Sequence, residues 1–211
     1  MKNGKIIGEI IEVSSRYCIA QSYELYGCPP IGDIVKCTDD NNEEIFGVVT
    51  NISTTSIDSG RRPNPKGPGF ENVTDIYTEN PEIEHLMKTE FNITFMGYKS
   101  YNKFSISIPP TPPKIFGFIH SVTEDELTTL FSDSNLIKFI VNSNMDLKDD
   151  VITLTINKYL NYKKTDKDEM IRFTNLLAQA LPDQIQRITN IINNLHIEED
   201  LNWVPKKISE L

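Results

Sequence analysis

Few residues of this chain belong to the types that usually build metal or redox sites. The 211 residues include 3 cysteines and 3 histidines, and none of them forms a Cys-x-x-Cys motif or a zinc-ligand spacing. We expect the histidines to be solvated or to cap local structure. The cysteines are odd in number, so we expect free thiols in a reducing compartment, where they pack as small apolar side chains. These six residues are His85, His120, His196, Cys18, Cys28 and Cys37.

Long hydrophobic runs are also missing. No stretch of about 18 apolar residues occurs, so we expect no transmembrane helix. The segment Met1–Lys5 leads into a strand-like alternation without a long apolar region or a cleavage site, so we expect no signal peptide. Abundant isoleucine, asparagine and lysine follow the codon bias of an AT-rich genome, such as that of a streamlined bacterium or an organelle. The expected location is therefore the cytoplasm, or the plastid stroma if the gene is organellar.

Positive charge is scarce. The chain has 21 Lys and Arg against 30 Asp and Glu, which gives a net charge of −9 at pH 7. Binding to nucleic acid requires a broad cationic surface that neutralises phosphates, and an acidic chain does not offer one. We therefore expect no direct binding of nucleic acid or of an anionic membrane by the isolated chain.

Catalytic motifs do not occur in the sequence. The Gly60–Gly69 stretch contains three prolines and lacks the GxxxxGK[ST] order of a phosphate-binding loop, and there is no GxSxG motif. The acidic runs Glu124–Glu126 and Glu198–Asp200 are best explained as helix N-terminal or solvated charges. We expect a protein that is not an enzyme and needs no cofactor or metal. The alternative is a small-ligand-binding barrel or a hydrolase with an unrecognised carboxylate site.

What the chain does have is a series of short β-branched segments bounded by Gly, Pro, Asn or Asp, the pattern of half-buried strands and turns. Asp39–Asn42 is typical of a hairpin turn, and the four prolines of Pro109–Pro113 predict an extended connector. Because closure removes exposed sheet edges, the pattern favours a small antiparallel β-barrel of six to seven strands over residues 1–120. The predicted strands are 6–13, 16–22, 31–38, 44–53, 91–99, 103–108 and 114–120.

A long loop, residues 54–75, interrupts these strands and is followed by a short helix with Asn80 as N-cap and Pro81 at its first position. Loops of this length are uncommon and often functional. The loop contains the one concentrated positive patch of the chain, formed by Arg61, Arg62 and Lys66. We interpret the patch as a partner-binding site, because Arg makes bidentate contacts with acidic groups. The alternative is an ordered loop whose arginines pair with Asp58 and Glu71.

The remaining residues, 121–211, predict a helical C-terminal region. Thr123–Glu126 forms a capping box, whereas residues 134–160 are compatible with either strands or helices. Two amphipathic helices follow from residue 166, and their apolar stripes must be buried on the barrel, on each other or on another chain. The tail 202–211 is expected to be irregular. The stripes are Met170, Phe173 and Leu177 in the first helix and Ile185, Ile188, Ile192 and Leu195 in the second.

Five aromatic residues lie on or near neighbouring predicted strands. They could form an exposed platform for stacking single-stranded nucleic acid, or they could be buried in the barrel core or under the helices. The negative net charge favours the second interpretation. These residues are Tyr98, Tyr101, Phe104, Phe116 and Phe118.

The order of these elements resembles the HAS barrel, a small β-barrel at the N-terminus of HerA-type DNA-translocating ATPases and of the catalytic subunits of ATP synthase. The similarity covers roughly residues 5–131, and its motifs are short and built from glycine and apolar residues. The matching segments are Ile7–Ile10, Ile31–Val35, Phe46–Val49 with its long loop, Phe95–Tyr98, the proline-rich connector, and Gly117–Ile119 leading into Glu124–Leu127.

The chain differs from these ATPases after the barrel, where about eighty residues of helical character replace the Walker-type domain. It therefore resembles a stand-alone barrel protein of the kind found in cyanobacteria. Family barrels serve mainly in subunit contacts and ring assembly, so the resemblance implies an interaction role and carries over no catalytic residue. We expect a non-catalytic interaction or assembly subunit that docks on a protein partner, such as a larger ATPase or nucleic-acid-processing complex, or on itself.

Overall fold

A seven-stranded antiparallel sheet forms the N-terminal part of the computed structural model, which describes residues 4–58, 60–101, 103–143, 145, 148–163 and 167–195. The strand order is β2-β1-β7-β3-β4-β5-β6, and β2 also pairs with β5. Six strands thus close into a ring, and β6 extends the sheet beside β5. The strands are β1 (Ile6–Val13), β2 (Tyr17–Ser22), β3 (Ile34–Thr38), β4 (Glu44–Ser56), β5 (Met87–Ser100), β6 (Lys103–Ser105) and β7 (Phe118–Ser121).

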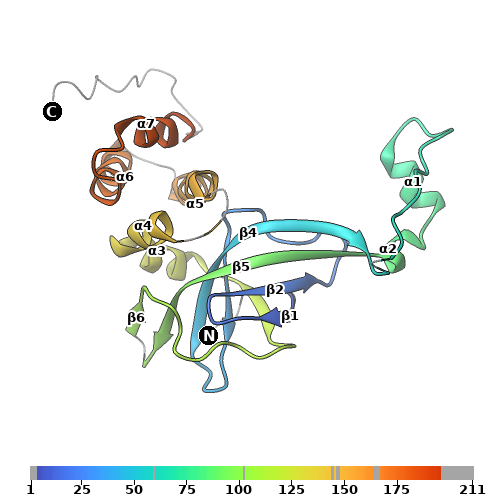
Figure 1. The fold of residues 1–211 in the computed structure, drawn as a ribbon, viewed down its shortest axis with the longest axis horizontal. Helices are drawn as coiled ribbons and strands as arrows, with labels where there is room; N and C mark the ends of the chain where they lie inside the picture. The colour runs from blue at the N-terminus through green and yellow to red at the C-terminus, as the bar shows by residue number, and fades with distance from the viewer. Residues whose placement is uncertain are drawn as a thin grey trace.

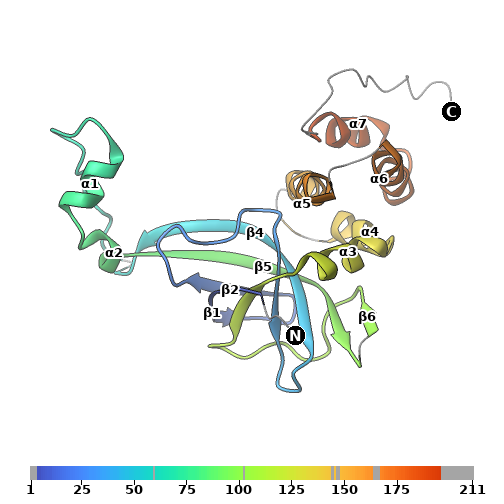
Figure 2. The same cartoon turned by 180° about the vertical axis from the view of Figure 1, so that it is seen from behind.

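Helices form most of the remaining described chain. Five of them follow the last strand and gather over one end of the barrel, whereas two short ones lie at its other end (Figures 1 and 2). The prediction of a small barrel of six to seven strands followed by a helical region is confirmed. The helices are α1 (Val73–Glu79), α2 (Ile83–Leu86), α3 (Glu124–Ser132), α4 (Asn135–Asn142), α5 (Lys148–Lys163), α6 (Lys167–Ala180) and α7 (Ile185–Asn193).

Alternating residues of the strands fill the interior of the barrel. Two of the three cysteines belong to this cluster, and burial raises the pKa of the Cys18 and Cys37 thiols, which favours the neutral apolar form. Both therefore pack as small apolar side chains, as the sequence predicted. The cluster consists of Ile10, Cys18, Ala20, Val35, Cys37, Ile45, Val49, Phe91, Ile93, Phe95 and Ile119.

A second apolar cluster joins the outer face of the barrel to the helices. From the strands it includes Ile34, Phe46, Val48 and Met96, and every helix from α3 to α7 contributes buried residues. Phe131, Tyr159 and Phe173 form its aromatic centre, with ring centroids 4.2–5.8 Å apart. Of the three alternatives for the helical stripes, burial within one chain holds for every predicted stripe residue except Ile185, which is 58% exposed at the start of α7.

The described part of the ambiguous region 134–160 contains α4 and most of α5, and no strand. In α4 the buried residues are Leu136, Ile137, Ile140 and Val141, a spacing that places all four on one helix face. The β-branched residues of α5 made this segment compatible with a strand, but in the structure they pack against neighbouring helices from successive helical turns.

The predicted hairpin turn between β3 and β4 is confirmed. The Asp39 carboxylate accepts hydrogen bonds from the backbone N–H groups of Asn41 and Glu43, each 2.8 Å long. Asn42 adopts a left-handed conformation with φ of 57°, which asparagine tolerates better than most residues. This turn fixes the register in which Thr38 lies opposite Glu44.

Several predicted boundaries shift. β4 and β5 are longer than expected and pair as far as Ser56 and Met87, so the loop begins at residue 57 and Met87 is a strand residue. The helix expected after Asn80 shortens to α2, and residues 73–79 form an unpredicted helix, α1. The predicted strands 103–108 and 114–120 shrink to β6 and β7, because the chain leaves the sheet beside the proline-rich connector.

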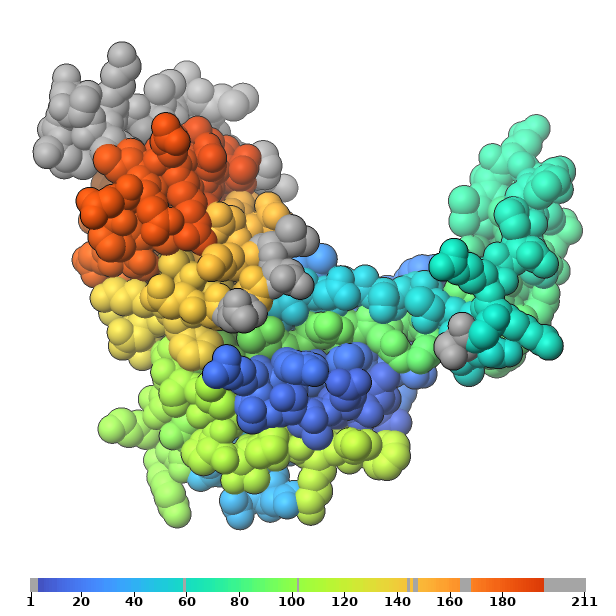
Figure 3. Space-filling view, in the orientation of Figure 1, coloured from blue at the N-terminus to red at the C-terminus, as the bar shows by residue number. Residues whose placement is uncertain are grey.

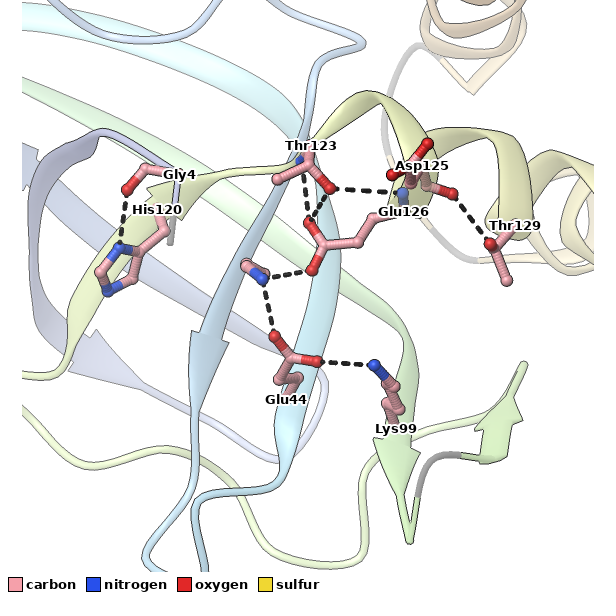
Figure 4. A network of polar contacts seen from close by, with 9 residues as sticks. Gly4, Glu44, Lys99, His120, Thr123, Asp125, Glu126 and Thr129 are labelled. Atoms are coloured by element: carbon pink, nitrogen blue, oxygen red, sulfur yellow. Dashed lines mark hydrogen bonds and ion pairs between the residues drawn. The ribbon is translucent and has the colours of Figure 1, made fainter. Parts of the chain in front are cut away.

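A buried lysine, Lys36, connects the barrel to the first helix of the helical region. Its two partners, Glu44 and Glu126, are labelled in Figure 4. The side chain of Lys36 is 8% exposed, and its ammonium group donates to Glu44 Oε1 at 2.6 Å and to Glu126 Oε1. Burial alone lowers the pKa of Lys36, but the hydrogen bonds to Glu126 and Glu44 outweigh it and raise this pKa above its usual value. The ammonium group therefore remains charged while it links β3, β4 and α3.

The carboxylate of Glu126 also completes the predicted capping box of α3. Its Oε2 atom accepts from the backbone N–H of Thr123 at 2.8 Å, and the Thr123 hydroxyl accepts from the Glu126 N–H at 3.4 Å. Burial alone raises the pKa of Glu126, but the hydrogen bonds from Lys36 and Thr123 lower it below its ordinary value. One carboxylate thus caps a helix and pairs with a strand lysine.

We predict that Lys36→Met lowers the free energy of unfolding by about 3 kcal/mol, because it leaves the partly buried Glu126 carboxylate without its counter-ion and Glu44 with Lys99 alone. Urea unfolding at neutral pH measures the loss. The control is Lys114→Met, since Lys114 is 75% exposed and pairs with Asp40 at the surface. That variant should stay within about 0.5 kcal/mol of the parent. A Lys36→Met protein as stable as its parent would contradict the proposed role of the buried ammonium group.

The lowered pKa of Glu126 predicts a pH-dependent contribution to stability. A carboxyl group with a lower pKa in the folded state stabilises the fold above its unfolded pKa, about 4.3, and loses this effect as the pH falls through the folded value. The stability difference between the parent and Glu126→Gln should therefore be constant near neutral pH and shrink on acidification. Urea titrations at a series of pH values measure it, with Glu79→Gln on the exposed face of α1 as control. A difference that does not change with pH would disprove the linkage.

Candidate interaction site: the β4–β5 arm

The segment between β4 and β5, residues 57–86, projects from the end of the barrel opposite to the helical region. We call it the arm. Figure 3 shows it rising on the same side of the barrel as the helices, with an open hollow between them. A backbone hydrogen bond of 2.9 Å from Ile57 N–H to the Leu86 carbonyl closes its base. Neither α1 nor α2 contains a buried residue, so the arm has no core of its own.

Polar contacts order the arm. Lys66 donates to the Asn80 side chain at 2.5 Å and to Glu82 at 2.8 Å, which ties the loop to the segment between α1 and α2. The hydrogen bond from Lys66 lowers the pKa of Glu82. Asn72 caps α1 by accepting from the Asp75 N–H at 3.0 Å. Lys66 is therefore engaged within the arm and belongs to its framework.

A tyrosine pair attaches the arm to the barrel. The hydroxyl groups of Tyr26 and Tyr77 are 2.7 Å apart, and their rings meet edge to face with centroids separated by 6.2 Å. The backbone N–H of Tyr26 donates to the Thr89 hydroxyl at the start of β5, which anchors the loop after β2. This contact was not predicted, because it joins residues that are far apart in the sequence.

The two arginines of the predicted site lie on the surface of the arm. The Arg61 side chain is 86% exposed, and its Nε atom lies 3.5 Å from Asp58 Oδ2. Arg62 is exposed as well, and among the described residues no hydrogen bond or ion pair engages its side chain. The expected pairing of an arginine with Asp58 therefore occurs, whereas Glu71 forms no ion pair with either arginine. A pair this exposed contributes little to stability, so Arg61 and Arg62 can exchange it for a partner's carboxylates.

A smaller candidate site is the cavity of about 250 Å³ between the barrel, α3 and α5. Its apolar lining includes Ile34 and Leu127, and its most buried charged group is Asp33, which pairs with Lys158 of α5. Burial raises the pKa of Asp33, and Lys158 only partly offsets this effect. Its volume lies slightly below the range of about 300–1,000 Å³ that small-molecule pockets occupy.

A close backbone approach positions Asp33 in this cavity. The preceding residue, Gly32, has φ of +87°, and a Cβ atom there would lie 2.7 Å from the Leu154 Cβ atom of α5. Only glycine both tolerates this positive φ and leaves room for the helix, so the loop before β3 can contact α5 directly. Across the cavity, a hydrogen bond to Glu124 raises the pKa of Tyr162 to about 12. The tyrosine therefore keeps its proton at neutral pH.

The predicted aromatic group is divided in the structure. Phe104 packs against Phe46 with ring centroids 5.3 Å apart, and Tyr98 packs partly buried against the barrel core. The other three side chains are exposed: two lie in connecting segments, and Phe118 begins β7, which pairs with β1 and β3. The prediction of core packing is therefore confirmed for Phe104 and Tyr98. The three exposed residues are Tyr101, Phe116 and Phe118.

The histidines do not converge on a site. His85 lies on α2 of the arm, and the Nδ1 atom of His120 on β7 is 3.3 Å from the Gly4 carbonyl. His196 and the predicted irregular tail 202–211 lie outside the described residues. No group of three or more His, Cys, Asp or Glu side chains with metal-binding geometry occurs in the described part of the chain. Nor is any helix within that part long and apolar enough to span a membrane.

No protein-family model matches the chain, and neither does any of the curated proteins with which it was compared.

Proposed function

We propose that the protein is a non-catalytic interaction or assembly subunit, built on a HAS-type barrel, that docks on a larger protein complex through the arm. The observation that carries this proposal is the exposure of the arm. Neither of its helices has a buried residue, and it presents two accessible arginines on a protein that is acidic as a whole. A surface element that is held only by polar contacts adds little to the stability of the rest of the chain. Loops held on a rigid scaffold commonly carry recognition.

The chemistry of the arm favours an acidic protein surface as partner. Arg61 and Arg62 offer planar guanidinium groups that bind carboxylates in bidentate fashion. The arm also offers apolar side chains, because Ile57, Val73 and Leu86 are each more than half exposed. Arginine is among the residues enriched at interface hot spots. We infer a complex such as a larger ATPase or a nucleic-acid-processing machine, in the cytoplasm or the plastid stroma.

The order of the strands and the place of the arm between the two longest ones support the affiliation with HAS barrels. In the sequence motifs of that family a long loop follows the segment that here is Phe46–Val49, and in this chain the arm follows the same strand, β4. The barrel then leads through Gly117–Ile119 into a capped helix, α3.

A small-ligand-binding barrel is the second candidate function. The cavity beside Asp33 favours it, because a buried, ion-paired carboxylate with a raised pKa in a mainly apolar pocket is a recurrent feature of binding sites. The same ion pair also joins the barrel to α5, which is sufficient reason for it to exist. We therefore rank this function below protein docking.

We predict that the double variant Arg61→Ala/Arg62→Ala weakens association with the partner about tenfold at low salt, a change of about 1.4 kcal/mol. The effect should shrink as salt screens the interaction. The melting temperature of the double variant should not change, since substitutions at such exposed positions usually alter the free energy of unfolding by no more than about 0.5 kcal/mol. Co-purification from native host extract, quantified by mass spectrometry at low and high salt, measures the association.

The matched control is Lys103→Ala/Lys114→Ala, which removes two exposed cations from the barrel and should leave co-purification intact. Lys66→Ala is tested separately, because it disturbs the arm from within. If the arginine variant and the control retain the same partners equally well at both salt concentrations, the arm is only a connector. A saturable small ligand in native mass spectrometry, with no protein partner, would favour the second candidate.

A further inference from the structure

A groove of about 810 Å³ lies between the barrel and α4. Phe95, Ile106 and Phe139 give it an apolar floor, and the more exposed Tyr17 and Ile108 extend that surface toward solvent. The groove is separate from both the arm and the Asp33 cavity, since no residue lines more than one of them.

Helix α4 uses two faces, one buried in the core and one that lines this groove. Its buried stripe packs into the shared core, whereas Asn135, Lys138, Phe139 and Asn142 follow the spacing i, i+3, i+4 and i+7 and line the groove. Residues at this spacing lie on one face of a helix. A half-buried phenylalanine flanked by two asparagines and a lysine is suited to hold an extended segment through both apolar and polar contacts.

The groove is cationic, although the protein is acidic. Arg16 on the barrel side and Lys138 on α4 are its two charged lining residues. Within the described residues neither side chain forms a hydrogen bond or an ion pair, whereas acidic partners engage cations elsewhere, as in the Lys36 and Arg187 pairs. Two uncompensated cations beside an apolar floor favour a segment that combines carboxylates with large apolar side chains.

The chain contains such a segment just beyond its last described helix. It reads Ile197-Glu198-Glu199-Asp200-Leu201-Asn202-Trp203, with three consecutive acidic residues and the single tryptophan of the protein. Trp is among the residues most enriched at binding hot spots, because it buries a large rigid surface. The charge and the apolar anchors of this segment complement those of the groove.

The acidic run cannot cross the groove of its own chain. Asp200 lies five residues after Leu195, and an extended chain covers at most about 18 Å in that interval. In both cartoon views α5 and α6 lie between α7 and α4 (Figures 1 and 2). Both α4 and α7 pack on α5 and on α6, so a layer of helices separates α7 from α4, and the groove lies beyond α4, against the barrel. A second copy is free of this restriction.

We propose that the groove between the barrel and α4 binds the acidic segment Ile197–Trp203 of a second copy of this chain. Arg16 and Lys138 pair with the carboxylates of Glu198–Asp200, and the apolar floor receives Leu201 or Trp203. This self-association uses a surface distinct from the arm, so it can fail while the docking function of the arm stands, and the reverse also holds.

Charge exchange on the full-length protein tests the proposal. Sedimentation velocity over a concentration series should show self-association of the parent. Arg16→Glu/Lys138→Glu and Glu198→Lys/Glu199→Lys/Asp200→Lys should each raise the dissociation constant at least about tenfold. A protein that carries both sets of substitutions restores opposite charges and should recover most of the association. Arg61→Glu/Arg62→Glu on the arm is the matched control and should self-associate as the parent does.

Circular dichroism and thermal unfolding verify that each variant is folded. Misfolding is not expected, because Arg16 and Lys138 line an open groove and the other set lies after the last described helix. A parent protein that stays monomeric at the highest soluble concentration would overturn the proposal. Unchanged association of either charge-reversal variant would overturn it as well. So would a combined variant that remains as weak as the separate ones, because complementary charges would then not be paired.

Discussion

A buried ammonium group fixes where the first helix of the helical region meets the barrel. Lys36 points out of the barrel from β3 and is enclosed by Glu44 of the neighbouring strand and by Glu126 of the first helix. Because an isolated charge at this depth would be costly, helix α3 must begin where its capping carboxylate reaches the lysine. The position of α3 then determines where the following helices meet the outer apolar face of the barrel. The helical region is thereby held over one end of the closed sheet, and the other end is left for the arm.

This arrangement separates structural from recognition elements. The barrel core and the shared barrel–helix core bury most of the large apolar residues that the strands and the last five described helices provide. The arm contributes to neither core and is ordered by Lys66, by the cap at Asn72 and by the Tyr26–Tyr77 contact. A segment so constructed can keep Arg61 and Arg62 accessible without loss to the fold. This division is the physical basis for assigning partner docking to the arm.

Periodicity explains how much of the fold could be predicted. The β-branched segments, the Asp39 turn and the Thr123–Glu126 capping box depend on local chemistry, and each occurs as expected. Helix α1 was missed because its sequence has no buried stripe, although Asn72 followed by Asp75 was a detectable capping signal. For the candidate site, exposure of the arginines was predictable from a Gly- and Pro-rich loop. The framework role of Lys66 was not, because its partners Asn80 and Glu82 follow many residues later.

Native-state amide hydrogen exchange measures most directly whether the barrel and helices form one cooperative body from which the arm projects. We expect the slowest amides of β3, β4, α4 and α6 to exchange with the same free energy, equal to that of global unfolding. Amides of α1 in the arm should exchange with a much smaller free energy, through local opening that leaves the core intact. Exchange of α4 and α6 at a free energy well below that of the barrel strands would contradict the account, because the helical region would then open independently.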